Sequence, residues 1–194
     1  MTVVPSEPRP RRRVGAPIMM VVAMWLVVFL DATTPTPLVQ YGIRPRSEEG
    51  LIGIFAAPFL HANLAHLIAN TGAFLILGLA IALTTRRFWP ATIGVALISG
   101  FGVWIIGAPN TVHVGASGLV YGYAAFLVAW GLFTRRLVSI LVAVAVVLFY
   151  GGLVFGVLPT QEGVSWQGHL FGAVAGVIMA YRLSRSRRPA RLPR

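Results

Sequence analysis

Residues 64–84 read LAHLIANTGAFLILGLAIALT, an apolar run that contains no acidic residue, lysine or arginine. An α-helix rises about 1.5 Å per residue, so about 20 apolar residues cross the hydrocarbon core of a bilayer. This run is therefore long enough to form a membrane-spanning helix. Outward from it in both directions, runs of similar length recur along most of the chain. The six expected spans are residues 15–34, 64–84, 90–107, 117–133, 137–157 and 168–183.

The composition of the whole chain points to the same class of protein. Of its 194 residues, 57% are hydrophobic and only 11% are charged, which is far from the composition of soluble domains. We therefore expect an all-α membrane protein that forms a bundle of six transmembrane helices. The chain has no cysteine, which excludes a disulfide framework, a thiolate nucleophile and a cysteine-ligated metal site.

The basic residues are all arginines, and they are unevenly distributed. A net charge of +11 would suggest nucleic-acid binding in a soluble protein. Here the arginines lie between apolar runs, so we expect them to contact the anionic lipids of a bilayer, with no nucleic acid as partner. Because arginine-rich segments face the cytoplasm, both termini are predicted to be cytoplasmic, and residues 35–61, 108–116 and 158–167 to face outward. Fourteen of the 16 arginines lie on the predicted inner side, at 9–13, 86–87, 135–136 and 182–194.

The two ends of the chain differ from its middle in composition. Residues 1–14 and 184–194 are rich in proline and arginine, and we expect them to be disordered cytoplasmic tails because they are too polar to bury. Residues 15–183 between them are predicted to form one six-helix domain. The abundance of Arg, Ala, Val and Gly is typical of a GC-rich bacterial genome, so we expect the plasma membrane of a bacterium, its inner membrane, as the location.

Four polar residues within the spans share one depth. In the predicted orientation, His66 and Asn70 lie in the outer half of their helix, whereas Ser117 and His169 lie near the outer start of theirs. Polar groups in hydrocarbon are costly unless they are paired or face water. Their coincidence indicates a functional site. The alternative is that each residue separately hydrogen-bonds a neighbouring helix.

Glycines at a spacing of four residues flank two of these positions. Such glycines allow two helix backbones to approach closely. If the two glycine faces pack together, the Ser117 hydroxyl and the His169 ring come within hydrogen-bonding distance, an arrangement that activates a hydroxyl nucleophile. Tyr121 lies one turn after Ser117 on the same face and is placed to pack against the imidazole. The glycines are Gly118 and Gly122 beside Ser117, and Gly168, Gly172 and Gly176 beside His169.

His66 and Asn70 are four residues apart, so both lie on one face of their helix. Both side chains donate hydrogen bonds without a fixed charge, as stabilisation of the oxyanion in acyl transfer requires, although bonding between helices is again the alternative. Metal binding by His61 and His66 is disfavoured, because their spacing splays the two rings and no carboxylate lies nearby. His113 lies in a predicted outer loop, where we expect it to be solvated.

At these residues the chain resembles the rhomboid family of intramembrane serine proteases. The segment GASG at 115–118 with Tyr121 is similar to the family's nucleophile segment, HANLAHLIAN at 61–70 to its helix 2 signature, and GHLFGAVAG at 168–176 to its terminal histidine helix. The resemblance covers residues 15–183 and implies a rhomboid-like six-helix bundle. Many family members carry a Trp-Arg pair ahead of the helix 2 histidines where this chain has Ile52-Gly53, so the conformation of residues 35–61 is not predicted.

The resemblance also implies a catalytic dyad. Ser117 would be the nucleophile, His169 the general base, and Tyr121 the ring that stacks on the base. The reaction implied needs no metal and no organic cofactor. It also needs no third acid, and the sequence offers no carboxylate near the dyad, so we expect packing alone to hold the imidazole.

The remaining roles implied by the resemblance surround the dyad. His66, Asn70 and the backbone N–H of the nucleophile would form the oxyanion hole. Gly115 and Gly118 would support the nucleophile turn. His61 would take a structural or water-holding role at the mouth of the cavity.

The sequence disfavours several neighbouring mechanisms. GASGL is not the GxSxG elbow of α/β-hydrolases, the spans contain no acid pair for an aspartyl protease, and the polar residues do not continue inward as in a channel or transporter. We expect an endopeptidase that cleaves single-span membrane proteins in or near their membrane segment. The alternative is a catalytically silent rhomboid-like protein that binds membrane helices without cutting them.

Overall fold

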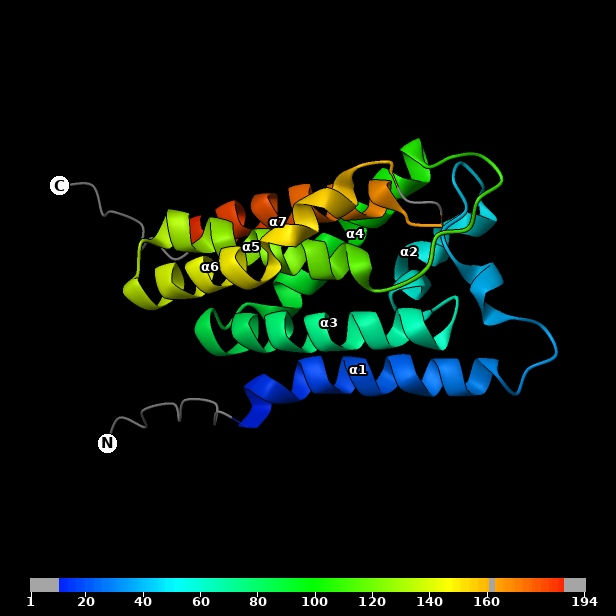
Figure 1. Ribbon diagram of the computed structural model, residues 1–194, viewed down its shortest axis with the longest axis horizontal. Coiled ribbons are helices and arrows are strands. Elements are labelled where there is room, and N and C mark those ends of the chain that lie inside the picture. The colour runs from blue at the N-terminus through cyan, green and yellow to red at the C-terminus, as the bar shows by residue number, and fades with distance from the viewer. Residues whose placement is uncertain (1–10, 161–162, 187–194) are drawn as a thin grey trace, which may run out of the picture.

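The computed structural model describes residues 11–160 and 163–186, and within these ranges the protein is helical and contains no β-strand (Figure 1). The described residues form seven α-helices and four short 3-10 helices. The α-helices are α1 (Arg11–Asp31), α2 (Gly53–Ala56), α3 (Leu64–Thr84), α4 (Phe88–Ile106), α5 (Ser117–Thr134), α6 (Leu137–Tyr150) and α7 (Trp166–Arg185). The 3-10 helices are η1 (Leu38–Tyr41), η2 (Glu49–Leu51), η3 (Ala57–Phe59) and η4 (Gly151–Val157).

Five segments are long and apolar enough to cross a membrane, which makes the chain a multi-pass membrane protein. They coincide with the first five expected spans. The last helix, α7, has 20 residues but carries Gln167, His169 and two arginines in its last turn, so it is less apolar than the others. The five segments are Val14–Asp31, Leu64–Thr84, Phe88–Ile106, Ser117–Thr134 and Leu137–Val157.

At three of the helix ends that differ from the expected ones, the difference has a local reason. α1 ends at Asp31, before residue 34, because the Asp31 carboxylate accepts a hydrogen bond from the N–H of Leu38 and the chain turns back. α6 ends at Tyr150 and continues as η4, whose first two residues are glycines that disfavour an α-helix. α7 begins at Trp166, because the Ser165 hydroxyl caps it by accepting from the Gly168 N–H.

The predicted tails are described only where the helices reach into them. α1 begins at Arg11 and α7 ends at Arg185, so each helix extends a short way beyond the expected domain of residues 15–183. The predictions for residues 1–10 and 187–194 lie outside the described residues.

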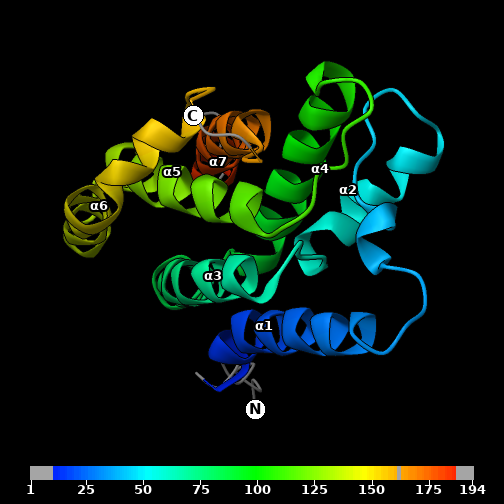
Figure 2. The same ribbon diagram turned by 45° about the vertical axis from the view of Figure 1, so that its right-hand side comes forward.

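Helix α5 is the centre of the bundle and packs against α3, α4, α6 and α7 (Figure 2). The side chains of Tyr123, Phe126 and Trp130 on this helix are fully buried. The Tyr123 hydroxyl is paired with the Thr92 hydroxyl of α4 at 2.7 Å, as a buried phenol requires. The outer surfaces of α1 and α6 instead expose large aliphatic side chains, which is the pattern of helices that face lipid.

The closest helix contact joins α5 to α7 and runs along the two glycine tracks. A Cβ at Gly172 would collide with the carbonyl oxygen of Gly118, and a Cβ at Gly176 with that of Gly122. The backbones are therefore close enough that only glycine fits at these positions. The packing of the two glycine faces that the sequence predicts is present, and it brings the starts of α5 and α7 together.

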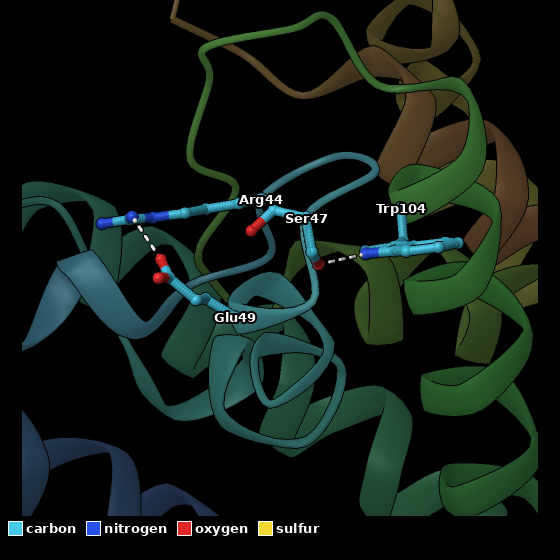
Figure 3. A network of polar contacts seen from close by, with 4 residues as sticks. All are labelled: Arg44, Ser47, Glu49 and Trp104. Carbon is cyan, nitrogen blue, oxygen red and sulfur yellow. Dashed lines mark hydrogen bonds and ion pairs between the residues drawn. The ribbon is translucent and has the colours of Figure 1, made fainter.

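The loop between α1 and α3, whose conformation the sequence did not predict, is held by hydrogen bonds to the C-terminal end of α4. The Trp104 indole donates to the Ser47 carbonyl at 2.8 Å, and Arg44 forms an ion pair with Glu49 at 3.3 Å (Figure 3). Arg46 donates to the carbonyls of Ile105 and Gly107 at 2.8 and 2.9 Å, which satisfies orphan acceptors at the helix end.

Ile52 and Gly53 occupy the positions where many members of the similar family carry the Trp-Arg pair. Ile52 is exposed, whereas Gly53 is buried against the backbone of Gly42 and Ile43. A Cβ at Gly53 would collide with that backbone, so an arginine would not fit there without moving the loop. The close contact of Gly53 with the backbone of Gly42 and Ile43 therefore fixes the conformation of this loop.

Candidate active site

Ser117 is the first residue of α5 and follows a tight turn. Gly115 has a φ of +109°, a left-handed conformation that favours glycine. A Cβ at Gly115 would also collide with the ring of His66. The Gly115 N–H donates to the Ala57 carbonyl at 2.8 Å, which fixes the turn to the start of η3. The nucleophile candidate is thus presented by a turn that only glycine allows.

His169 lies in the first turn of α7 and is paired with Ser117. Its Nε2 is 2.9 Å from the Ser117 Oγ, and its Nδ1 is 2.8 Å from the Gly156 carbonyl oxygen. A carbonyl oxygen only accepts, so Nδ1 carries the proton. In the neutral ring Nε2 is then unprotonated and accepts from the Ser117 hydroxyl, which is the tautomer that a general base requires.

Tyr121 stacks on the His169 ring. The ring centroids are 4.0 Å apart and the planes are inclined by 5°. The sequence indicated this contact but not the partner of Nδ1. The expectation that packing alone holds the imidazole was incomplete, because the Gly156 carbonyl of η4 also orients it. The glycines in GGLVFG at 151–156 signal an irregular helix end, but nothing in the sequence shows which carbonyl faces the histidine.

Gly156 fits its position only because it has no side chain. A Cβ there would collide with the Tyr121 hydroxyl and lie 3.3 Å from His169 Nδ1. At Gly151 and Gly152 in the same segment, an added Cβ would meet no atom within 4 Å. Only the glycine that contacts the dyad is therefore sterically restricted.

A cavity of about 850 Å³ extends from Ser117 and His169 towards α3. His66 and Asn70 line it from α3, and Tyr121 lines it from α5. Asn70 is only 5% exposed, and its Nδ2 has no hydrogen-bond partner among the described residues. An unpaired buried donor is unfavourable by about 1–3 kcal/mol, so Asn70 retains unused capacity to donate to a molecule in the cavity.

A second cavity, of about 40 Å³, lies on the other side of Ser117. Ile43, Ile54 and Val103 contribute apolar walls, and Ser99 contributes a hydroxyl. Ser117 is thus reached from a large cavity with several polar walls and from a small, mostly apolar one.

His61 lies behind His66 and is not among the residues that line the larger cavity. It is 3% exposed, its ring meets the His66 ring edge to face at 5.2 Å, and neither ring nitrogen has a partner among the described residues. Burial, and next the proximity of His66, lower the pKa of His61 to about 4. His61 is therefore neutral and packed against His66 inside the protein.

His113 is less exposed than its loop position led us to expect. It is half-buried, with Nδ1 2.7 Å from the Ser165 hydroxyl and Nε2 2.9 Å from the Thr111 hydroxyl. Its backbone forms an antiparallel bridge with Ile43 in the segment between α1 and α3. Burial lowers its pKa. The loop packs against the start of α7, and the hydroxyls of Thr111 and Ser165 bond the two ring nitrogens.

Taken together, the helices and the paired residues define a class: a multi-pass helical membrane protein with a serine–histidine pair at the edge of a partly polar cavity. The chain belongs to the rhomboid family, because the family model of the Rhomboid domain matches residues 48–186.

Relatives among curated proteins are consistent with this membership. An uncharacterized protein of Mycobacterium tuberculosis is 43% identical over 194 residues, covering 94% of this chain and 81% of the relative. An uncharacterized protein of Mycobacterium leprae is 44% identical over 177 residues, covering 87% and 70%. A Bacillus subtilis protein named "Putative rhomboid protease YdcA" is 26% identical over 126 residues, covering 63% and 62%.

Proposed function

We propose that the protein is an intramembrane serine endopeptidase that cleaves single-span membrane proteins in or near their membrane segment. The observation that carries this proposal is the hydrogen bond of 2.9 Å between Ser117 Oγ and His169 Nε2. Serine is a weak nucleophile unless a neighbouring base takes its proton. The Gly156 carbonyl at Nδ1 supports the tautomer in which the ring takes that proton.

In the proposed reaction, Ser117 Oγ attacks the carbonyl carbon of the scissile peptide bond while its proton moves to His169 Nε2. The imidazolium that forms is stabilised by the Gly156 carbonyl and by the face of the Tyr121 ring. Collapse of the tetrahedral intermediate breaks the C–N bond, and the leaving amine takes the proton from Nε2. An acyl-enzyme remains at Ser117.

Water from the larger cavity completes the cycle. It transfers a proton to His169 and attacks the acyl carbonyl, and the proton returns to Ser117 Oγ as the new carboxyl product leaves. In both steps the carbonyl oxygen becomes negative. The unpaired Nδ2 of Asn70, the His66 ring and the Ser117 N–H at the start of α5 are the proposed donors to it. The reaction requires no metal and no organic cofactor.

The proposed topology places six spans, α7 included, in the plasma membrane of a bacterium, with both ends in the cytoplasm. α7 is long enough for this role at 20 residues. The start of α1, the end of α5 and the end of α7 lie at one end of the bundle (Figure 1). Arg135, Arg136, Arg182 and Arg185 lie in the chain segments at that end, where anionic lipid headgroups of the inner leaflet would meet them. Product release would then be outward.

The test is covalent labelling of the purified protein in detergent by an alkyl fluorophosphonate. We expect labelling at Ser117, none in Ser117→Ala, and none in His169→Ala. Ser139→Ala is the matched control, because Ser139 is a buried serine on α6, and it should be labelled like the parent. Equal labelling of the parent and Ser117→Ala would overturn the proposal in favour of a silent protein that binds membrane helices.

A further inference from the structure

His113 stands at the centre of a chain of hydrogen bonds that joins three outer segments. Its backbone N–H and carbonyl both pair with Ile43, each at 2.9 Å. Its ring bonds Thr111 in its own loop and Ser165 at the start of α7. His113 thus links the segment between α1 and α3, through its backbone, and its own loop, through its ring, to the N-cap of α7.

The directions of these hydrogen bonds follow from their end points. The Thr111 hydroxyl is 2.6 Å from the Ala108 carbonyl, which only accepts, so it donates there and accepts from His113 Nε2–H. His113 Nδ1 is then the unprotonated nitrogen of a neutral ring, and it accepts from the Ser165 hydroxyl. The Ser165 oxygen in turn accepts from the Gly168 N–H at 3.2 Å.

In this series of hydrogen bonds, every donor and acceptor is used once and the directions agree with one another. The lowered pKa of His113 supports the neutral ring that this pattern needs. Because the Ser165 hydroxyl donates to His113 Nδ1, the lone pairs of its oxygen remain free to accept from the Gly168 N–H. The ring of His113 therefore fixes the rotation of the Ser165 side chain, and with it the cap of α7.

The cap of α7 is one helical turn from the candidate base. The His169 N–H donates to the Ser165 carbonyl at 3.2 Å, so a displacement of Ser165 moves His169 relative to Ser117. A displacement of about 1 Å at a reacting pair lowers a rate by about 100-fold. The contact between His113 and Ser165 is therefore placed to set the geometry of the dyad from outside it.

We propose that His113 is a positioning residue, which holds the start of α7 through Ser165 so that His169 stays aligned with Ser117. The functional part of this inference rests on the proposed protease activity. The structural part, that His113 orders the first turn of α7, is independent of catalysis.

The kinetic experiment compares three variants at position 113 in cleavage of a single-span model substrate in liposomes. In His113→Asn the amide oxygen takes the place of Nδ1 and still accepts from Ser165, so we expect most of kcat to remain. In His113→Gln the amide takes the place of Nε2 and restores only the Thr111 bond. We expect His113→Gln and His113→Phe to lose about 10- to 100-fold in kcat, with KM unchanged.

Two further variants separate positioning from general loosening of the outer loops. Ser165→Ala should lower kcat, and adding His113→Phe to it should lower kcat no further, because both changes remove one interaction. Trp104→Phe is the control, since it removes the bond to Ser47 in the outer loop, which is not part of the chain to α7. Its kcat should equal that of the parent.

A readout without catalysis tests the structural part. The parent should show an unprotonated Nδ1 and a protonated Nε2 for His113 in ¹⁵N spectra of the histidine rings, and protected amides at Gly168 and His169 in hydrogen exchange. His113→Phe should speed exchange at these two amides, and His113→Asn should not. If the parent fails to label at Ser117 but these results hold, the proposed function fails and the structural role of His113 stands.

Either of two results would overturn the inference itself. One is exchange at Gly168 and His169 that is the same in His113→Phe and the parent. The other is an active parent in which His113→Asn, His113→Gln and His113→Phe lose the same fraction of kcat.

Discussion

The two walls of the larger cavity differ in how their polar groups are used. On the wall formed by α5 and α7, the Ser117 hydroxyl bonds His169, and the His169 ring bonds the Gly156 carbonyl of η4. On the α3 wall, Asn70 keeps an unpaired buried donor. The first wall is arranged to activate a nucleophile before any substrate arrives. The second wall keeps a donor for the substrate carbonyl oxygen, which becomes negative only during the reaction. A hydrogen bond that strengthens only in the transition state raises the rate.

The largest expected effect comes from breaking the paired wall. His169→Ala removes the proton acceptor for Ser117 and leaves the α3 wall intact, so kcat should fall by at least about 10⁴-fold. The measurement is cleavage of a single-span substrate in liposomes, with Ser139→Ala as control. Residual activity within about 10-fold of the parent would mean that another group takes the proton.

The next effect comes from the unpaired wall. Asn70→Ala should lower kcat by about 100- to 1,000-fold, because one donor to the oxyanion is lost while the dyad remains. Fluorophosphonate labelling of Ser117 should persist at a reduced rate. Thr71→Val is the matched control, since Thr71 lies on the same helix but bonds Trp25 of α1. Turnover of Asn70→Ala equal to that of Thr71→Val would return Asn70 to a packing role.

A smaller effect is expected at the carbonyl that orients the base. Gly156→Ala places a Cβ against the Tyr121 hydroxyl and His169 Nδ1, and the resulting shift should lower kcat by about 10- to 100-fold. Gly152→Ala makes the same change in the same segment, where nothing lies within 4 Å, and should be silent. Equal loss in the two variants would mean that η4 matters only for overall stability.

The smallest effect concerns stability and the histidine behind the α3 wall. The pKa of His61 is about 4 in the folded protein against 6.5 for the free side chain, so the unfolded chain binds its proton first as the pH falls. The contribution is fully present above pH 6.5 and declines towards pH 4, by about 3 kcal/mol in total. Thermal unfolding in detergent should show this decline, and His61→Phe should make it shallower, since His113, whose pKa is also lowered, still contributes. Parallel pH profiles of the two proteins would contradict the neutral, buried assignment.

Most of the secondary structure was predictable because it depends on short stretches of sequence. Apolar runs of spanning length located α3, α5 and the other long helices, since each run alone satisfies the backbone and the bilayer. The four-residue spacing of glycines predicted the contact between α5 and α7, and so the meeting of Ser117 and His169. The side chains of Asp31 and Ser165 determine where α1 ends and where α7 begins. The periodicity of apolar residues does not detect such contacts.

The sequence by itself determined which side chains are available at one depth of the bundle: a serine, a base, two neutral donors and the glycines beside them. It did not determine which carbonyl faces His169 or what surrounds His113. Every residue carries a carbonyl, so only the packing of η4 against α7 selects Gly156 as the partner of Nδ1. A loop histidine has the same sequence signal whether it is solvated or buried. His113 is half-buried because the segments before α3, before α5 and before α7 fold against one another. Contacts between such distant segments are decided only by the tertiary structure.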